Sequence, residues 1–385
     1  MKSAVKKFPI LFLGTQMEVA GAQRSMLAQA RWFHEQGYPV QAVFFYDKQG
    51  LQHSWQAANP FPVISLDGWR AGRPVLFNIP NLIRGLVRLF SRLRNDVKAV
   101  VTFTPHSNLL GLPMAWLARV PVRIGTHHGY IEGSSRFMAW LHARLTNSRL
   151  SSTMVAVSSQ VRDYAIRQEK ANEKRLVVIR NGIEPLVKEF KNREDMRKQV
   201  GLPADGLLLL TVGRLTVQKG HTVLLDAIAK MAPRYPQARF AFAGDGPLRH
   251  SLEEQAARLG IADRVIFLGL REDVTSWLFA ADIFVQPSLW EGLSLALLEA
   301  LFAGLPVVAS WVEGVVDVVK DQKSALLVAP GEAEPLAAAM ARMIEDGALR
   351  QRIARAGQER AEKNFGIETM CKTYENLMQG LLNAA

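Results

Sequence analysis

Two glutamates interrupt a segment that is otherwise almost wholly apolar. The stretch PSLWEGLSLALLEALFAGLPVVAS runs from Pro287 to Ser310 and carries Glu291 and Glu299, with seven residues between them. Burying a charge costs several kcal/mol unless the charge is paired or hydrogen-bonded. The sequence therefore raises the question of which groups would satisfy these two carboxylates.

A helix is expected to begin near Leu293 or Ser294, just after a strand. The first N–H groups of a helix are unpaired, carry partial positive charge and can hold a phosphate. Glu291 would lie in the loop before this start and Glu299 within the helix, where sugar or ribose hydroxyls could donate to them. The alternative is a structural role, with one charge at the helix start and one buried salt bridge.

A second candidate group lies in TVGRLTVQKG, which follows the apolar run at 207–210. Arg214 and Lys219 are spaced so that one loop could bring both cations to one anion, since Arg offers a bidentate fork and Lys a mobile point charge. The alternative interpretation is a solvated basic loop. Two cations in one loop, together with the two downstream glutamates, favour an anion site.

Other nucleotide and metal signatures are absent or weak. The sequence has no GxxxxGK[ST] and no HExxH, which excludes a P-loop and the common zinc protease motif. In FAGDGPLRH, Arg249 replaces the third glycine of a dinucleotide fingerprint. His127 and His128 are adjacent and would point apart in a strand, which disfavours a joint metal site, so neither a metal nor a cofactor is expected.

The elements that must position these residues alternate between strand and helix through both halves of the chain. Strands are predicted at 8–14, 39–46, 97–103, 120–126, 153–159, 175–183, 207–214, 238–244, 265–270, 282–288, 305–310 and 324–330. Helices are predicted at 25–37, 79–96, 109–119, 159–168, 221–235, 294–304, 335–346 and 349–364. This alternation predicts two parallel sheets with helices on both faces, which bind ligands at the carboxyl ends of their strands. The charged, strand-poor span at 184–206 is expected to connect them.

Composition narrows the class of protein further. Apolar residues make up 49% of the 385, enough for a sizeable core, and the single cysteine, Cys371, rules out a disulfide framework. The start MKSAVKKFPILFLG resembles a signal peptide but reads better as a first buried strand. The net charge of +12 is concentrated in residues 1–180, which carry 24 Lys and Arg against 9 Asp and Glu. A basic half suits anionic partners such as nucleic acid, anionic lipid or a phosphorylated substrate.

Taken together, the motifs of the chain resemble those of the retaining glycosyltransferases of family 4, which are the group 1 glycosyltransferases with a GT-B fold. In the second half the resemblance rests on VGRLTVQKG, FAGDGPLR, VIFLGLREDV, ADIFVQPS and EGLSLALLEALFAGLPVVAS, in which the two glutamates form the family's Glu-x7-Glu pattern. The match in the first half is looser and rests on VAGAQRSM, FTPHSNLLG, IGTHHG, VAVSSQVRD and VIRNGI. The resemblance implies two Rossmann-like domains facing a central cleft. These would be an acceptor-binding domain at 1–183, a nucleotide-sugar-binding domain at 184–365, and a last helix at 366–385 that crosses back to the first domain.

The resemblance also assigns roles to residues. Arg214 and Lys219 match the pair that holds the donor diphosphate, Glu299 the residue that bonds the ribose, and Glu291 the one that contacts the donor sugar. The backbone amides of Leu295 and Ala296 would lie near phosphate, and Leu270 would lie beside the base. The other positions implied for the site are Gly213, Gly292 and Leu293 in the second domain and Gly21, His106 and His128 in the first domain. The family often has two glycines where this chain has Ala20-Gly21.

The reaction implied is transfer of a hexose from a nucleotide diphosphate, most simply UDP, to an acceptor hydroxyl with the anomeric configuration retained and no metal. The expected acceptor is a cell-surface glycan, a lipopolysaccharide or a lipid-linked sugar, and nucleic acid is not expected as a partner. A sugar-nucleotide epimerase of similar architecture and a noncatalytic GT-B partner protein are the alternatives. The expected location is cytoplasmic, with peripheral contact at the inner face of the cytoplasmic membrane.

That membrane contact would come from the basic domain. In 79–96, apolar residues recur at helical spacing, and arginines recur on another face at Arg84, Arg88 and Arg92. We expect the apolar face to pack on the first sheet and the arginines, with Arg70, Arg73 and Arg94, to meet anionic lipid without deep insertion.

Overall fold

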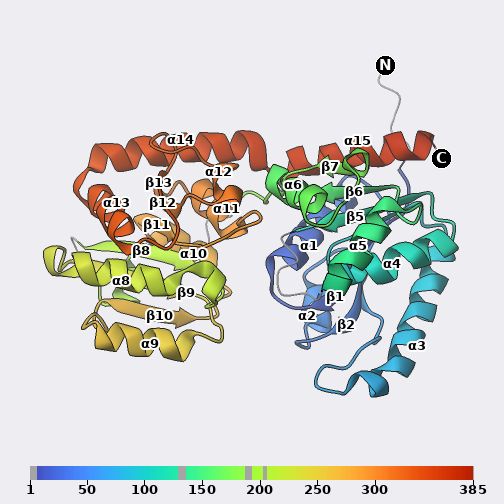
Figure 1. Cartoon of the computed structure of the whole chain (residues 1–385), viewed down its shortest axis with the longest axis horizontal. Coiled ribbons are helices and arrows are strands. Elements are labelled where there is room, and N and C mark those ends of the chain that lie inside the picture. Colours follow the sequence, from blue (N-terminus) through green and yellow to red (C-terminus); the bar gives the residue numbers. More distant parts are fainter. Residues whose placement is uncertain (1–6, 129–135, 187–192, 203–205, 385) are drawn as a thin grey trace. The chain divides into compact units, whose positions relative to one another are not determined.

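The computed structural model describes residues 7–128, 136–186, 193–202 and 206–384. The chain divides into two compact units (Figure 1). Unit 1 comprises Met1–Glu184 and Ile367–Ala385, and unit 2 comprises Pro185–Gly366. Each unit is built on one parallel β-sheet with helices on both faces, which confirms the fold class predicted from the sequence.

The sheet of unit 1 has seven strands in the order β3-β2-β1-β4-β5-β6-β7. The strands are β1 (Ile10–Met17), β2 (Val40–Asp47), β3 (Val63–Ser65), β4 (Ala99–Thr102), β5 (Val122–His127), β6 (Thr153–Ala156) and β7 (Leu176–Val178). The helices are α1 (Gly21–Glu35), α2 (Gln52–Ala57), α3 (Val75–Arg94), α4 (Pro105–Leu117), α5 (Arg136–Asn147), α6 (Ser159–Arg167) and, from the chain end, α15 (Ile367–Asn383), with a 3-10 turn η1 (Glu173–Arg175).

Strand β1 shows why both faces of this sheet are covered. Successive side chains of a strand point to opposite faces. Ile10 and Phe12 enter a core shared with α1 and α15, whereas Leu11 and Leu13 enter a second core shared with α3 and α4. A continuous apolar run such as Ile10–Leu13 is typical of a strand of a parallel sheet that is buried on both sides.

The last helix completes the first of these cores. Met370, Tyr374 and Met378 of α15 are buried among residues of α1 and β1, and Leu377 packs against the same cluster. Tyr38 donates a 2.5 Å hydrogen bond to Glu375. The segment at 367–384 thus belongs to the packing of unit 1, although unit 2 precedes it in the sequence.

The sheet of unit 2 has six strands in the order β10-β9-β8-β11-β12-β13. The strands are β8 (Leu207–Val212), β9 (Ala238–Ala243), β10 (Val265–Gly269), β11 (Ile283–Gln286), β12 (Val307–Ser310) and β13 (Leu326–Val328). The helices are α7 (Arg193–Gln199), α8 (His221–Met231), α9 (Arg249–Arg258), α10 (Val274–Ala280), α11 (Leu295–Phe302), α12 (Glu313–Val316), α13 (Ala333–Glu345) and α14 (Gly347–Phe365), with 3-10 turns η2 (Val217–Lys219) and η3 (Ala232–Arg234).

Both sheets contain a point where the strand order reverses direction. In unit 1 it lies between β1 and β4, and in unit 2 between β8 and β11. The helices that follow two such strands leave on opposite faces, so a crevice opens at the carboxyl ends, where ligands of doubly wound sheets bind. The candidate residues at 213–220 and 287–299 follow β8 and β11, and therefore fall at this point of unit 2.

The amphipathic segment at 79–96 behaves differently along its length. In the second half of α3, Leu93 of the predicted apolar face is buried as expected, and Leu89, which that face did not include, is buried as well. The first half does not pack in this way, because Ile79 and Ile83 are 43% and 57% exposed. The expectation that the whole apolar face packs on the sheet is therefore wrong. Among the described residues, no helix is long and apolar enough to cross a bilayer.

Candidate active site

Two loops of unit 2 meet at the reversal of strand order. Because β8 and β11 are parallel neighbours, their carboxyl ends lie at one edge and the loops that follow them run side by side. The backbone N–H of Leu289 donates to the carbonyl of Gln218 at 2.8 Å, and the Gln218 side chain donates to the carbonyl of Trp290 at 3.1 Å. These bonds hold the loop that carries Lys219 against the loop that carries Glu291.

Lys219 and Glu291 form an ion pair, with 2.5 Å between Nζ and Oε1. The lysine side chain is 21% exposed and the glutamate side chain 5%. The same carboxylate oxygen accepts hydrogen bonds from Ser288 at 2.7 Å and from Gln286 at 3.4 Å. The protein itself therefore supplies donors to Glu291, and this buried salt bridge accounts for the charge without a ligand.

Glycine permits the close approach of these loops. Gly220 has φ +65°, and a Cβ there would lie 2.0 Å from the carbonyl oxygen of Pro287. At Gly314, the second residue of α12, a Cβ would lie 2.6 Å from the carbonyl oxygens of both Glu291 and Gly292. Backbone packs directly on backbone at both contacts, so the Glu291 loop is held from two sides.

The helix after this loop begins as the sequence indicated. Ser294 is the N-cap of α11, where its hydroxyl accepts from the amide of Leu297 at 3.2 Å and donates to Gln286 at 2.9 Å. The amides of Leu295 and Ala296 are the first two of the helix and have no partner within it. Such amides are suited to an anion.

The remaining candidates of unit 2 lie around this helix start. Glu299 lies inside α11 and is 4% exposed, and Gly292 and Leu293 are buried in the preceding loop. Arg214 is exposed and follows Gly213, next to which the aliphatic part of Lys219 passes. Leu270 is 67% exposed directly after β10, two strands away from β8. The structure thus brings Lys219 into contact with Glu291, while Leu270 belongs to a different part of the same edge.

His221 is a neighbour of this group that the sequence analysis did not single out. It is the first residue of α8 and is 2% exposed, with its ring 5.6 Å from that of Phe242. Burial, and then the charge of Lys219, lower the pKa of His221 from 6.5 to about 4. The imidazole is therefore neutral at pH 7. The sequence could have indicated His221 as a neighbour of the site, because it directly follows Lys219 and Gly220 of the candidate loop.

The three candidates of unit 1 lie on or beside different elements, namely α1, α4 and the end of β5. Gly21 is the exposed first residue of α1, and Ala20 before it has an extended φ of −144°, which alanine adopts readily. His106 is exposed in the first turn of α4, which a capping box between Thr104 and Ser107 fixes. His128 follows β5 and stacks on Phe103 with 5.4 Å between ring centroids.

The environment of His128 keeps it neutral. Burial lowers its pKa from 6.5 to about 4. Its Nδ1 lies 3.5 Å from the side-chain nitrogen of Asn181, whose oxygen accepts from Ser25 of α1 at 3.3 Å. These contacts join the end of β5 to α1. The next residue of the IGTHHG motif, Gly129, lies outside the described residues.

A buried cluster behind this strand end was missed in the sequence. His127, His142 and Glu169 each offer a ligand atom, and these atoms lie within 4.8 Å of one another. All three residues are at most 5% exposed. The sequence analysis considered His127 only together with His128, whereas the structure places it with His142 and Glu169. The three residues come from β5, α5 and the loop after α6. Because they are far apart in the sequence, no short motif predicts that they form a cluster.

The hydrogen bonds around His142 fix the position of its proton. The oxygen of Asn108 accepts from Thr102, so the amide nitrogen of Asn108 is the group that faces His142 Nε2 at 2.8 Å. An amide nitrogen only donates, so Nε2 accepts and Nδ1 carries the proton. That Nδ1 lies 3.5 Å from Glu169. His142 Nδ1, His127 Nε2 and both carboxylate oxygens of Glu169 are buried and make no hydrogen bond among the described residues. A metal on Nδ1 of His142 would require the other tautomer.

Two family models match consecutive parts of the chain. Residues 20–182 match "Glycosyl transferase 4-like domain" and residues 192–360 match "Glycosyl transferases group 1". Among curated proteins, the chain is 29% identical over 233 residues to an uncharacterized glycosyltransferase of Methanocaldococcus jannaschii, a match that spans 59% of this chain and 60% of that protein.

Two bacterial relatives have more specific names. A UDP-Gal:alpha-D-GlcNAc-diphosphoundecaprenol alpha-1,3-galactosyltransferase of Escherichia coli is 27% identical over 69% of this chain and 72% of its own length. The lipopolysaccharide core biosynthesis glycosyltransferase LpsE of Rhizobium meliloti is 33% identical over 47% of this chain and 52% of its own length.

Solved structures agree at the level of the fold. Anabaena HepE in complex with UDP-glucose has a TM-score of 0.85 at 23% identity, covering 97% of this chain and 100% of that one. WaaG, described as a glycosyltransferase involved in lipopolysaccharide biosynthesis, has a TM-score of 0.74 at 18% identity over 96% of this chain and 100% of its own. Two parallel-sheet units of this kind define the GT-B fold. The chain belongs to the group 1 glycosyltransferases.

Proposed function

We propose that this protein transfers a sugar from a UDP-sugar bound by unit 2 to a hydroxyl of an acceptor bound by unit 1, with retention of the anomeric configuration and without a metal. The observation that carries the proposal is the Lys219–Glu291 pair beside the start of α11. Lys219 is held against the loop that leads into α11, at the reversal of strand order. A cation and unpaired helix amides at such a point are groups suited to a diphosphate, which supports the proposal.

The chemistry follows from where charge develops. As the bond to the donor sugar breaks, negative charge builds up on the leaving diphosphate, and preorganised cations and amides aimed at that charge lower the barrier. Lys219, Arg214 and the amides of Leu295 and Ala296 would supply this stabilisation. Glu299 would bond the ribose and Glu291 the donor sugar. We assign no general base, and the leaving phosphate would help to deprotonate the acceptor.

The donor and acceptor classes are inferred from the relatives. The structural neighbour was solved with UDP-glucose, and one curated relative is named for a UDP-galactose donor and a diphosphoundecaprenol-linked acceptor. Others are named for lipopolysaccharide core biosynthesis. We therefore propose a UDP-hexose as donor and a lipid-linked or lipopolysaccharide glycan as acceptor, with His106, His128 and Gly21 on the acceptor-binding unit.

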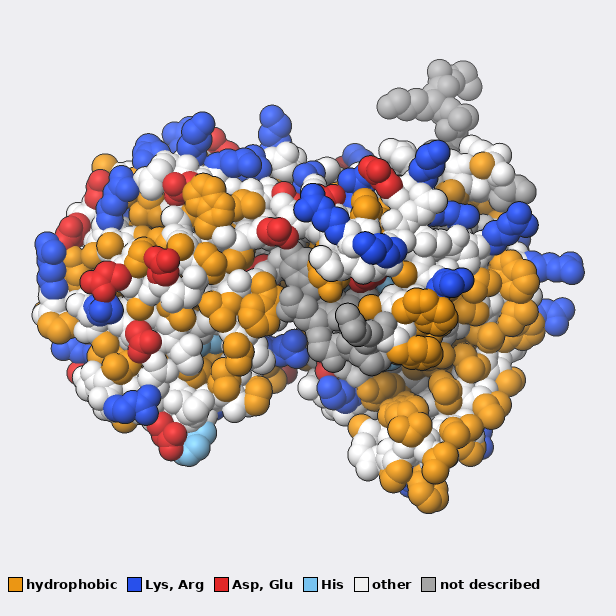
Figure 2. Space-filling model, viewed as in Figure 1, with side chains coloured by type: hydrophobic (Ala, Val, Ile, Leu, Met, Phe, Trp, Pro, Cys, Tyr) orange, Lys and Arg blue, Asp and Glu red, His pale blue; other side chains and the backbone are white. Residues whose placement is uncertain are grey.

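The surface of unit 1 supports peripheral contact with a membrane. Exposed apolar side chains gather on the first half of α3 and at its start (Figure 2), and those most exposed are Val75, Leu76 and Phe77, at 67%, 77% and 69%. Helices that lie at a bilayer surface combine such residues with basic ones. Arg84 is exposed on the same helix, whereas Arg88 is bonded to Leu66 and Asp67. We propose that apolar residues of α3 insert and that the arginines assist.

The experiment that tests the transferase is nucleotide release from a panel of UDP-sugars, with and without membrane lipid extract, in EDTA. Release that depends on the extract, with the sugar recovered on a glycan or lipid, supports the proposal. A donor that is isomerised without any acceptor would indicate an epimerase. A protein that binds no UDP and releases none from any donor would contradict transfer altogether.

A further inference from the structure

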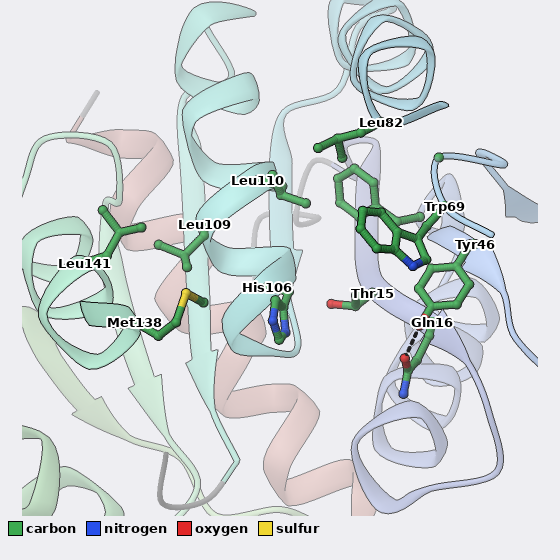
Figure 3. Close-up of a pocket in the computed structure, with 12 residues that line it drawn as sticks. Thr15, Gln16, Tyr46, Trp69, Leu82, His106, Leu109, Leu110, Met138 and Leu141 are labelled. Atoms are coloured by element: carbon green, nitrogen blue, oxygen red, sulfur yellow. Dashed lines mark hydrogen bonds between the residues drawn. The ribbon is translucent and has the colours of Figure 1, made fainter. Parts of the chain in front are cut away.

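Unit 1 contains a cavity of about 550 Å³ at the reversal of its strand order. It is formed by the ends of β1 and β2, the loop after β3, and the helices α3, α4 and α5 (Figure 3). A volume of this size lies within the range of about 300–1,000 Å³ that is common for small-molecule sites. The proposed donor residues lie in unit 2 and take no part in it.

The lining of the cavity is divided by polarity. In Figure 3, His106 and Thr15 lie near the middle of the view and Gln16 below them, with Tyr46 hydrogen-bonded to Gln16 and Met138 level with His106. The rest of the wall is aliphatic or aromatic. It is formed by Phe45, Trp69, Leu82, Leu109, Leu110, Met138 and Leu141, together with Gly68.

This division selects the chemical class of the ligand. A sugar ring buried against the apolar wall would leave hydroxyls without hydrogen-bond partners, at a cost of about 1–3 kcal/mol for each one. An aliphatic chain loses nothing there and gains from leaving water. The polar end, in contrast, offers hydroxyl, amide and imidazole groups to a head group.

The apolar wall also continues to the protein surface. On α3, Leu82 lines the cavity while its neighbours Ile79 and Ile83 are 43% and 57% exposed. On α5, Met138 lines the cavity while Phe137 is 62% exposed. An aliphatic chain can therefore pass from the exposed apolar surface of α3 and α5 into the cavity while keeping apolar contacts.

We propose that this cavity holds the aliphatic chain of the acceptor, so that the acceptor is an amphiphile whose chain, isoprenoid or acyl, is bound by the protein during transfer. Its head group lies at the polar end, beside His106 and the end of β1. The proposal rests on the proposed function, because it identifies the acceptor class of the same enzyme. It differs from membrane contact by α3 alone in that a single chain is withdrawn into the protein.

The test is direct binding of geranylgeranyl monophosphate, below the concentration at which it aggregates, to the full chain. Trp69 in the wall should report binding through its fluorescence, and Trp69→Phe assigns the signal. Leu110→Trp fills the cavity and should weaken binding at least about tenfold. The matched control is Leu117→Trp, on the same helix but 53% exposed and outside the cavity, which should bind as the wild type does.

Further arms separate the alternatives. Glucose 1-phosphate, a head group without a chain, should not compete, whereas lysophosphatidylglycerol, which carries a single acyl chain, should compete. Met138→Trp provides a second filling variant, and circular dichroism confirms folding. Absence of wild-type binding, or equal affinity in all variants, would overturn the inference, as would full competition by the sugar phosphate. UDP affinity is measured on the same samples, so intact UDP binding would leave the proposed transferase standing.

Discussion

Lys219 and Glu291 stabilise each other, and this dependence shapes what substitution at either residue will do. The pair is largely buried, and breaking such a pair by removing one partner leaves an uncompensated charge. Ser288 and Gln286 also donate to the glutamate, so the carboxylate retains some partners if the lysine is lost. Effects on folding and on catalysis must therefore be measured separately at this site.

Lys219→Met should lower turnover by about a hundredfold at saturating donor, because a charged group aimed at the leaving diphosphate is worth about 3 kcal/mol in the transition state. Steady-state nucleotide release measures the effect. Lys230→Met, on exposed α8 surface, is the control and should leave turnover unchanged. Near-normal turnover in Lys219→Met would show that this lysine does not act on the diphosphate.

The free energy of unfolding gives a second prediction for the same pair. Lys219→Met and Glu291→Gln should each destabilise unit 2, Lys219→Met by about 3 kcal/mol. The double variant should lose less than the sum, because neither substitution then leaves a buried charge alone. Urea titration of the four proteins measures this coupling. Strict additivity would mean that the ion pair contributes nothing specific.

His221 makes stability depend on pH in a defined direction. Its pKa is about 4 in the folded chain against 6.5 when unfolded. Between these values the unfolded chain binds the extra proton, so the contribution is complete above pH 6.5 and is lost as the pH falls toward 4. The loss is at most about 3 kcal/mol. His221→Phe should unfold with a shallower pH dependence than the wild type over this range, by urea titration at pH 7 and 5. Equal slopes would refute the assignment.

The sequence predicted the residues of the candidate site better than their contacts. Glu291 and Lys219 were identified from type and spacing, but their mutual pairing was not, because it depends on two loops 72 residues apart being neighbours. The cluster of His127, His142 and Glu169 was missed for the same reason. Pairing across a sheet edge follows from strand order, which local patterns do not specify.

At the scale of elements, α3 shows where periodicity stops being informative. The 3.6-residue pattern predicted the helix and one apolar face, but the pattern cannot tell which part of that face has a sheet beneath it. Leu93 is buried, whereas Ile83 on the same helix is 57% exposed. The helices α2, α5, α7, α9, α10 and α12 and the strand β3 were not predicted. In the seven-residue α10, Trp277 and Leu278 are both buried, so an amphipathic period is hard to detect.

The exposed half of α3 gives a prediction for membrane binding. Phe77→Glu should reduce co-sedimentation with anionic vesicles at least about tenfold, since it removes an inserting group and adds a repelled charge. Trp311→Glu, at a residue of unit 2 that is 55% exposed, is the matched control and should have little effect. Binding that persists in Phe77→Glu but disappears in high salt would mean that the arginines, and not inserted apolar residues, hold the protein at the membrane.

At the scale of the whole molecule, the sequence predicted two α/β units and a terminal helix associated with the first. Repeated strand and helix patterns are sufficient for the two units, because they determine fold class and approximate boundaries, whereas the place of the terminal helix was implied only by the family resemblance. The patterns did not reveal that Glu375 would pair with Tyr38 and with Lys7. These contacts join parts of the chain separated by all of unit 2.

Tyr374→Ala tests the role of α15 in unit 1. The side chain is 1% exposed in the core shared with α1, and truncating a buried aromatic residue costs about 3–5 kcal/mol. Calorimetry should show a lowered transition for unit 1, with UDP binding by unit 2 retained. Thr373→Ala, an exposed neighbour on the same helix, should change little. A single transition shifted as a whole would mean that the two units unfold together.

The position of α15 has a consequence for synthesis on the ribosome. Unit 2 is one uninterrupted stretch of chain, so it can fold as soon as it has emerged. Unit 1 is made first, yet its core lacks Met370, Tyr374 and Met378 until the final helix leaves the exit tunnel. Translation proceeds at roughly 5–20 residues per second. Once Glu184 has been made, the apolar side of α1 therefore still waits through the synthesis of unit 2 and α15, about 200 residues or about 10–40 s at that rate. During this interval the apolar side of α1 lacks the cover of α15, so of the two units the one made first is the last to mature.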